Sequence, residues 1–210
     1  MSDNQSSQLD VISRLLQLEK SFRHAETIEE LAYILVNDSR YLLNYRQAAL
    51  WRMDNAEVFC VSGLAVVDTN VPYVFWLKRV CQQLSQSHAS TVTEISANDV
   101  KEEEATDWWQ WLPDHALWIP FSSFAGAAPV GLLLARETAW TESELYLMQH
   151  VADSFSHAWQ ALAPRASFWR QDWYSKKRLL ISLSVLLCVL LIPVRQTALA
   201  PASVIPAHPT

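Results

Sequence analysis

The hydrophobic positions along this chain follow two different spacings, and each spacing predicts one type of secondary structure. Where apolar residues recur every three or four positions, they form one face of an amphipathic helix. This spacing predicts helices over residues 8–24, 27–43, 72–84 and 141–162. Short runs rich in aromatic and β-branched residues, bounded by turn residues, are typical of strands. Such runs predict strands over residues 47–53, 57–64, 91–95, 116–122 and 129–136. The acidic, Trp-rich segment 98–111 is either a helix or an ordered loop.

Two of the predicted helices begin at a recognisable capping sequence. Thr27 is followed three residues later by Glu30, and Thr141 is followed in the same way by Glu144. In such a capping box the Thr side chain and the Glu side chain each accept a hydrogen bond from the backbone of the first turn. These capping sequences therefore predict that the two helices begin directly after Thr27 and Thr141.

The run from Leu179 to Val194 carries no charge, and its only polar side chains are Ser182 and Ser184. As a helix it would span roughly 24 Å, slightly less than a bilayer hydrocarbon core of about 30 Å. Basic side chains at both ends can extend their charged groups to the interface and make up the difference. We therefore predict a transmembrane helix over residues 179–195. The alternative, a buried helix of a soluble domain, is disfavoured because such helices rarely lack charge on every face for this length.

The charges beside this span predict its orientation. Lys176, Lys177 and Arg178 precede it, whereas Arg195 is the only charged residue after it. The positive-inside rule places the N-terminal side in the cytoplasm. We expect the membrane anchor to be completed by interfacial aromatic and basic side chains: Trp173, Tyr174, Lys176, Lys177 and Arg178. The prediction is a single-pass protein of the bacterial inner membrane, with a cytoplasmic domain (1–163), a basic aromatic connector (164–178) and a periplasmic tail (196–210).

Composition excludes several classes of function. The net charge of −6 argues against nucleic acid, which requires a basic face. With only three glycines, the chain cannot build a phosphate-binding loop or a dinucleotide fingerprint. The three cysteines form no CxxC pair, so we interpret them as reduced, structural thiols. The polar, acidic first residues predict no signal peptide, so insertion is expected to use the span at 179–195.

The predicted order of two helices, two strands, a helix, two strands and a long C-terminal helix resembles that of a GAF domain. The local match is strongest over Leu117 to Leu162, where a strand enters a turn and a second strand carries Gly131 followed by three leucines. A linker containing Trp140 then precedes the last helix. This resemblance covers roughly residues 9–162. It implies an α+β fold, with an antiparallel sheet flanked by helices.

GAF domains that bind ligands use a pocket between the sheet and its flanking helices. The resemblance therefore makes four tryptophans candidates for ligand binding: Trp108, Trp109, Trp111 and Trp118. Aromatic walls of this kind suit flat ligands, but the same residues can equally fill the core. The NKFDE pattern of cyclic-nucleotide GAF domains is not found, and Cys81 is followed by Gln82 and Gln83, not by the His of a bilin site. We therefore predict no cofactor.

The segment that follows the span resembles the start of a membrane fusion protein of the HlyD-like periplasmic adaptor family. It is apolar and contains prolines over residues 197–206, and the sequence ends before any lipoyl-like motif. Some adaptors of this kind carry a GAF-like domain before their span. The resemblance implies a non-enzymatic part of an export complex that contacts an inner-membrane transporter subunit. The 210 residues would then be part of a longer protein. The alternative is a membrane-bound GAF sensor that binds a small ligand and signals through dimer helices.

The cysteines and histidines are interpreted as structural or surface residues. Cys60 and Cys81 could suggest a reductase, but neither has a neighbouring base in the sequence. His150 and His157 share a helix face at a spacing unusual for metal ligands, so we predict neither a metal site nor a catalytic residue. Residues 101–104 are interpreted as a solvated loop. The predicted helices 8–24 and 141–162 are apolar on both faces, so we expect a homo-oligomer.

Overall fold

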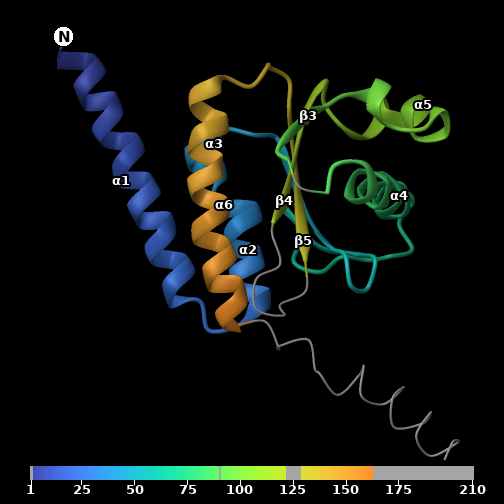
Figure 1. Cartoon of the computed structure of the whole chain (residues 1–210), viewed down its shortest axis with the longest axis horizontal. Helices are drawn as coiled ribbons and strands as arrows, with labels where there is room; N and C mark the ends of the chain where they lie inside the picture. Colours follow the sequence, from blue (N-terminus) through green and yellow to red (C-terminus); the bar gives the residue numbers. More distant parts are fainter. Residues whose placement is uncertain (1, 90, 122–128, 163–210) are drawn as a thin grey trace, which may run out of the picture. The chain divides into compact units, whose positions relative to one another are not determined.

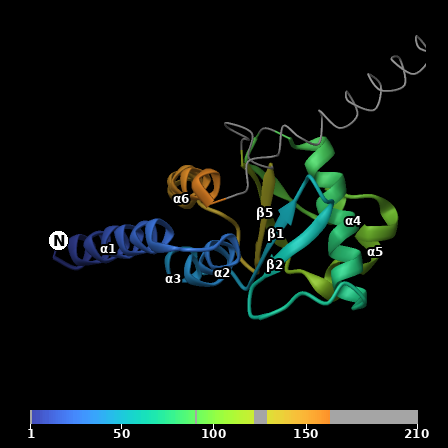
Figure 2. The same cartoon turned by 90° about the horizontal axis from the view of Figure 1, so that it is seen from below.

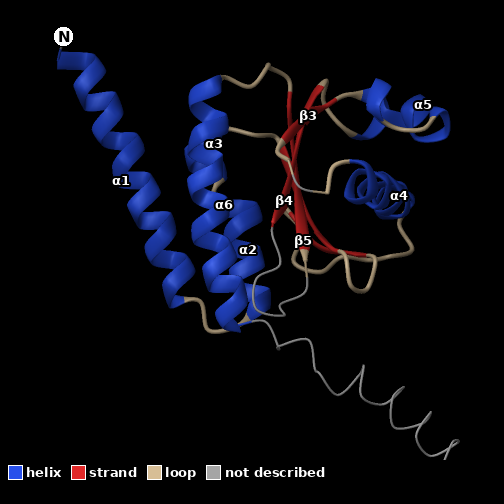
Figure 3. Ribbon diagram, in the orientation of Figure 1, coloured by secondary structure: helices blue, strands red, loops and turns tan. Residues whose placement is uncertain are grey.

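The computed structural model describes residues 2–89, 91–121 and 129–162. The helices in this part of the chain are α1 (Ser2–His24), α2 (Ile28–Asp38), α3 (Arg40–Leu43), α4 (Pro72–Ser87), α5 (Glu102–Trp111) and α6 (Glu142–Leu162), with a short 3-10 turn at Ala97–Asp99. The strands are β1 (Gln47–Arg52), β2 (Glu57–Val61), β3 (Thr93–Ile95), β4 (His115–Phe121) and β5 (Val130–Arg136). Figure 3 shows a central sheet with helices on both sides.

The five strands form one antiparallel sheet in the order β2-β1-β5-β4-β3. Strand β1 pairs with β5 along the whole length of β1, and β4 pairs with β5 along the whole length of both strands. The pairing of β4 with β5 sets Trp118 opposite Leu133 and Pro120 opposite Gly131. A register shift between Leu50 and Trp51 interrupts the pairing of β1 with β2. The predicted α+β class with an antiparallel sheet is confirmed.

Helices α1, α2 and α6 lie on one side of the sheet, and α4 and α5 lie on the other (Figure 1, Figure 2). Each side has its own hydrophobic core. The first joins Leu50 and Leu132 of the sheet to Phe22 of α1 and Phe155 of α6. The second lies beneath α4 and α5 and contains several tryptophans. The first and last long helices, α1 and α6, therefore share one side of the sheet.

The capping box at Thr141 and Glu144 forms, whereas at α2 the Thr27 side chain caps the helix and the Glu30 carboxylate binds the amide of the residue before the cap. The Thr27 hydroxyl accepts a hydrogen bond from the Glu30 amide at 3.1 Å, while the Glu30 carboxylate accepts one from the Glu26 amide at 2.8 Å. At the start of α6, the Glu144 carboxylate accepts a hydrogen bond from the Thr141 amide at 2.9 Å. These contacts join residues three or four apart, which explains why the sequence predicted both helix starts correctly.

The predicted second helix is interrupted at Ser39, where the structure has α2 and the separate turn α3. The Ser39 side chain is buried and donates to the Leu35 carbonyl at 2.5 Å, and it lies 2.9 Å from the Tyr45 hydroxyl. The Tyr45 hydroxyl also donates to the Val36 carbonyl at 2.9 Å. Side-chain bonds of this kind compete with the helical ladder and commonly bend or end a helix.

An ion pair between a buried arginine and a partly exposed glutamate holds the start of α6 against the sheet. Both terminal nitrogens of Arg136 on β5 lie 2.6 Å from the Glu144 carboxylate, and Arg136 is only 5% exposed. Its guanidinium also lies 3.9 Å from the centre of the Trp140 ring and donates to the Leu43 carbonyl at 3.3 Å. This hydrogen bonding by Arg136 lowers the pKa of Glu144 to about 2. One side chain therefore connects β5, α3 and α6.

Two predicted elements have other bounds in the structure, and three predicted segments fall outside the described residues. Helix α1 begins at Ser2, earlier than predicted, and the segment 98–111 resolves into the 3-10 turn and α5. The connector 164–178, the span 179–195 and the tail 196–210 lie outside the described residues. Across the residues that are described, no helix is both long enough and apolar enough to cross a bilayer.

Candidate functional site

The sheet face beneath α4 and α5 alternates small and very large side chains. Because successive residues of a strand point to opposite faces, this face receives every second residue. Its small members are Ala49, Ala116, Gly131 and Ala135, and its large members are Trp51, Trp118 and Leu133. Trp51 is 1% exposed and Trp118 is fully buried. The small residues leave the volume that the two indoles occupy.

Gly131 is the position where this space is tightest. A Cβ atom built on Gly131 would lie 2.3 Å from Cη2 and 2.4 Å from Cζ2 of Trp118. Carbon atoms in contact are normally about 3.5–4.0 Å apart. The Trp118 ring therefore lies directly over the backbone of β5, and only glycine fits beneath it.

The helices add two further indoles to the same layer. Trp76 of α4 and Trp108 of α5 pack edge to face, with ring centres 5.9 Å apart and an interplanar angle of 74°. Trp76 donates its indole N–H to the Glu104 carbonyl, and Trp108 donates to the Pro113 carbonyl, each at 3.1 Å. Trp118 donates to the His88 carbonyl at the same distance. Three of the four indole groups are thus fixed by hydrogen bonds to backbone carbonyls. We call Trp51, Trp76, Trp108 and Trp118 the tryptophan layer.

Trp51 differs from the other members of the tryptophan layer. Its indole nitrogen is buried and has no hydrogen-bond partner within the described residues. A buried indole N–H usually finds an acceptor, and an unmade hydrogen bond at a buried donor costs about 1–3 kcal/mol. Trp51 is therefore the one donor in this layer that remains available.

The four tryptophans predicted as ligand-binding residues separate into different environments. Trp108 and Trp118 are both fully buried in the second core. Trp111 packs at the edge of that core, with its ring centre 5.6 Å from that of Tyr73. Trp109 is 66% exposed on the outer face of α5. The structure packs three of the four into or against the second core, and the role of all four in binding a ligand stays a prediction.

Sequence reasoning missed Trp51 and Trp76, which complete the layer. The alternation along β1 carried the signal for Trp51, since Ala49 and Trp51 share one face of the strand. Trp76 neighbours Leu77 in the buried stripe of α4, so the helical spacing contained it as well. What the spacing could not indicate was that indoles from four separate elements would meet.

A buried carboxylate connects α4 to α5. The Glu104 side chain is 3% exposed, and its Oε1 lies 2.9 Å from Nε of Arg79. Its Oε2 accepts a hydrogen bond from the Gln83 side-chain amide at 2.7 Å. The interpretation of residues 101–104 as a solvated loop is therefore wrong for Glu104. It lies one helical turn before the buried Trp108, so both side chains project from the same face of α5.

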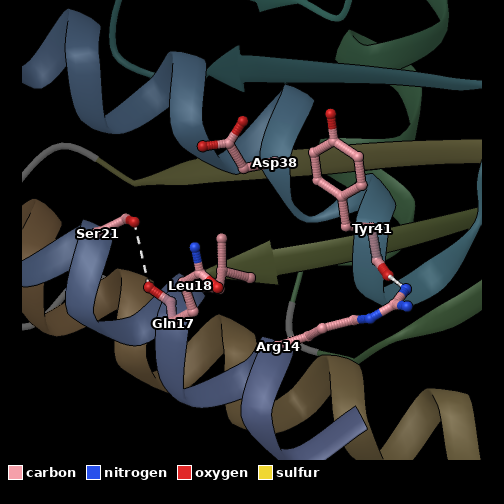
Figure 4. Close-up of a pocket in the computed structure, with 6 residues that line it drawn as sticks. All are labelled: Arg14, Gln17, Leu18, Ser21, Asp38 and Tyr41. Carbon is pink, nitrogen blue, oxygen red and sulfur yellow. Dashed lines mark hydrogen bonds between the residues drawn. The ribbon is translucent and has the colours of Figure 1, made fainter. Parts of the chain in front are cut away.

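Cavities that open on the surface of the described part of the chain are lined by residues outside the tryptophan layer. One of about 360 Å³ lies between α1 and the α2–α3 corner, lined by Arg14, Gln17, Leu18, Ser21, Asp38 and Tyr41. Figure 4 shows Arg14 reaching from α1 to the Tyr41 backbone carbonyl, a distance of 2.8 Å, while Ser21 turns back to Gln17 of its own helix. A second, of about 450 Å³, lies between the ends of α1 and α6 and includes Phe22 and His157. Another, of about 440 Å³, lies beside the start of α5 and includes Gln83 and Lys101.

The thiols and imidazoles show no sign of catalytic or metal-binding chemistry within the described residues. Burial raises the pKa of Cys60 to about 11 and also raises the pKa of the fully buried Cys81. A reactive cysteine needs a lowered pKa, so both thiols fit the structural interpretation. His150 and His157 are exposed on α6. Within the described ranges, no three His, Cys, Asp or Glu side chains are grouped as metal ligands.

Comparison with known proteins places the fold. No family model matches the sequence, and no curated protein matches it either. Among solved structures, the GAF domain of an Acinetobacter phosphoenolpyruvate-protein phosphotransferase matches with a TM-score of 0.52 and 10% identity, over 71% of this chain and 92% of that one. An N-acylhomoserine lactone dependent LuxR family transcription factor from Burkholderia cenocepacia matches with a TM-score of 0.50 and 16% identity, over 72% and 94%. A far-red absorbing dark-state structure with bound biliverdin IXα matches with a TM-score of 0.50 and 14% identity, over 71% and 98%.

These similarities establish a GAF-like fold for the described part of the chain. At identities this low they concern the fold alone. The resemblance to a GAF domain that the sequence suggested is thus confirmed at the level of fold.

Proposed function

We propose that this GAF-like domain is a non-enzymatic assembly or regulatory module of an inner-membrane export adaptor. In this proposal residues 179–195 anchor the protein, and the domain contacts a transporter subunit on the cytoplasmic side. The observation that carries the proposal is the tryptophan layer. It fills the space between the sheet and helices α4 and α5, so the domain acts through its outer surface.

The hydrogen bonds of the layer support this interpretation. Trp76, Trp108 and Trp118 each donate to a backbone carbonyl of the same domain. A ligand that entered this layer would have to displace packed rings and break these bonds. The layer therefore acts as structure, and a change in its occupancy is not needed for function.

The outer surface of the same helices offers contact groups. Trp109 on α5 is 66% exposed and Phe75 on α4 is 57% exposed. Large aromatic side chains dominate the binding energy of many protein interfaces. Trp109, which the sequence made a ligand candidate, is in this proposal a contact residue for the transporter subunit.

The anchoring part of the proposal depends on the sequence. The uncharged run from Leu179 to Val194 has three basic residues immediately before it and only Arg195 after it. This asymmetry supports a cytoplasmic N-terminus and a periplasmic C-terminus. The apolar, proline-containing segment after the span supports the start of a periplasmic adaptor region.

A second candidate function is a membrane-bound sensor, and Trp51 favours it. Its buried indole N–H has no acceptor within the described residues. A small ligand with an acceptor oxygen or nitrogen would satisfy this group if the tryptophan layer opened. Signalling would then pass through helices α1 and α6 of a dimer.

Two measurements on the intact protein test the proposals. The first is extraction of membranes with alkaline carbonate: the adaptor proposal expects the protein to stay in the membrane fraction and a variant lacking residues 179–195 to be released. The second is thermal unfolding with a panel of flat ligands, including tetrapyrroles, cyclic nucleotides and acyl-homoserine lactones. A ligand that binds the folded state raises the unfolding temperature in a concentration-dependent way.

The outcomes separate the candidates. Retention in the membrane with no shift for any ligand supports the assembly module. A shift that is lost in Trp51→Phe, which keeps an aromatic ring but removes the indole N–H, supports the sensor. Release of the intact protein by carbonate would exclude the anchor on which both candidates depend.

A further inference from the structure

The cavity between α1 and the α2–α3 corner contains one charge that the protein leaves unbalanced. This cavity of about 360 Å³ lies on the side of the sheet opposite to the tryptophan layer (Figure 1, Figure 2). Among the described residues that line it, only Arg14 and Asp38 are charged. Arg14 forms an ion pair of 2.6 Å with Asp10 of its own helix and donates to the Tyr41 carbonyl at 2.8 Å. The charge of Arg14 is therefore balanced, and that of Asp38 is not.

The Asp38 carboxylate has no partner of its own. Within the described residues it makes neither a hydrogen bond nor an ion pair, so neither Arg14 nor the nearby Arg40 neutralises it. Figure 4 shows the Arg14 guanidinium reaching towards α3 and away from the Asp38 carboxylate. Burial raises the pKa of Asp38. Partial loss of water without a compensating cation disfavours the charged carboxylate.

The position of Asp38 in its helix adds to this cost. Asp38 is the last residue of α2, and the last turn of α2 contains no basic side chain. The C-terminal end of a helix carries partial negative charge, so that an acidic side chain is unfavourable there and a cation is favourable. Residues that break such a local rule are often found at functional sites. A bound cation would balance both the carboxylate and the helix end.

We propose that this cavity binds a small molecule with one primary ammonium group, which pairs with the Asp38 carboxylate. The other walls fit such a ligand. The Ser21 hydroxyl donates to the Gln17 carbonyl at 3.1 Å, which leaves the lone pairs of the hydroxyl oxygen free to accept from an ammonium group. The ring of Tyr41 can contact the cation with its face. Leu18, which is 5% exposed, offers an apolar contact for the carbon chain.

The size and the charges of the cavity limit the ligand further. A volume of about 360 Å³ lies at the lower end of the range for ligand pockets, which suits a small molecule. The guanidinium of Arg14 in the same wall repels a second positive group. A monoamine is therefore expected to bind more tightly than a diamine or a polyamine.

A series of ligands that differ in charge tests this chemistry. Butylamine, butan-1-ol and butanoate have carbon chains of the same length and carry a positive, a neutral and a negative group at neutral pH. Ligand-observed NMR titrations of the intact protein in detergent, at physiological salt, measure the three dissociation constants, and micelles without protein give the background. Butylamine is expected to bind at least about tenfold more tightly than the other two. The diamine putrescine should bind more weakly than butylamine.

Two substitutions locate the site. Asp38→Asn keeps the size of the side chain but removes its charge, and should weaken butylamine binding by at least about tenfold. Tyr41→Leu removes the aromatic face and should weaken it by about two- to fivefold. The matched control is Asp153→Asn, an exposed aspartate of α6 outside the cavity, which should leave the dissociation constant unchanged.

The stability of the ligand-free protein gives an independent measure. Because the Asp38 carboxylate has no partner, Asp38→Asn should leave the unfolding temperature unchanged or raise it. A lowered unfolding temperature would show that the carboxylate stabilises the fold by itself, and would overturn the proposal.

Two outcomes of the titrations would also overturn it. If butylamine and butan-1-ol bind equally, or if neither binds, the cavity does not recognise an ammonium group. If butylamine binds Asp38→Asn as tightly as the native protein, the amine is held elsewhere.

Discussion

Replacing Gly131 by alanine tests the tryptophan layer most directly. The added methyl group would lie 2.3 Å from Cη2 of Trp118. To restore an ordinary contact of about 3.5 Å, the ring or the strand must move by roughly 1.2 Å. The ring is not free to do so, since Trp118 is fully buried and donates a hydrogen bond to the His88 carbonyl.

The magnitude follows from this geometry. Adding a methylene-sized group to a well-packed core typically costs about 1–3 kcal/mol. The extensive burial around Trp118 places Gly131→Ala towards the upper end, at about 2–3 kcal/mol of unfolding free energy. Urea unfolding of the intact protein, followed by far-ultraviolet circular dichroism, measures this difference.

A double-mutant cycle identifies the cause. Trp118→Phe removes the distal indole atoms with which the new methyl group collides, at its own cost of about 2 kcal/mol for the cavity. The two changes together should then destabilise the protein by less than their sum, with a coupling of about 1 kcal/mol or more. Gly63→Ala is the control: Gly63 has a positive φ of 78° and no atom near the added Cβ, so its cost is backbone strain. That cost should add to the Trp118→Phe cost without coupling.

Two results would refute the reasoning. If the free energy of unfolding of Gly131→Ala lies within about 0.5 kcal/mol of that of the native protein, the ring and strand adjust freely and the layer is not closely packed. If the Gly131→Ala and Trp118→Phe costs simply add, then the loss comes from the strand itself and not from the contact with the indole.

Two further predictions concern ion pairs in which one of the two side chains is buried. Because the folded-state pKa of Glu144 is lowered to about 2 from 4.5 by its bond to Arg136, its contribution to stability is complete above pH 4.5 and is lost as the pH falls towards 2. Glu144→Gln should therefore lower the free energy of unfolding by about 1–2 kcal/mol at pH 7, allowing for solvent screening of the partly exposed carboxylate. In urea titrations this difference in free energy from the native protein should shrink below pH 4.5. A difference that stays constant with pH would contradict the assignment. Glu104→Gln should lower the free energy of unfolding by about 1–3 kcal/mol, because it removes the ion pair with Arg79 at a buried site. The exposed neighbour substitution Glu103→Gln should stay within about 0.5 kcal/mol, and equal effects of the two would show that Glu104 does not clamp α5 to α4.

The elements of this fold were largely predictable from local patterns. The capping contacts at Thr27 and at Thr141 form between residues three or four apart, and such contacts depend little on the rest of the molecule. The short apolar runs at 116–122 and 129–136 correctly predicted the two strands that pair along their whole length. Local spacing and turn residues were sufficient here because each of these interactions is completed within one element or between neighbouring elements.

Contacts between distant elements decided the rest. Trp108 and Trp109 are neighbours in sequence, yet one is fully buried and the other is 66% exposed, because α5 presents only one face to the sheet. In the sequence, Glu104 is one of several neighbouring acidic residues, and only the tertiary structure places Arg79 and Gln83 of α4 beside it. The meeting of four indoles in the second core likewise depends on packing between strands and helices that are far apart in the chain. Hydrophobic spacing indicates that a residue is buried, but the partner that it meets depends on how the layers pack in three dimensions.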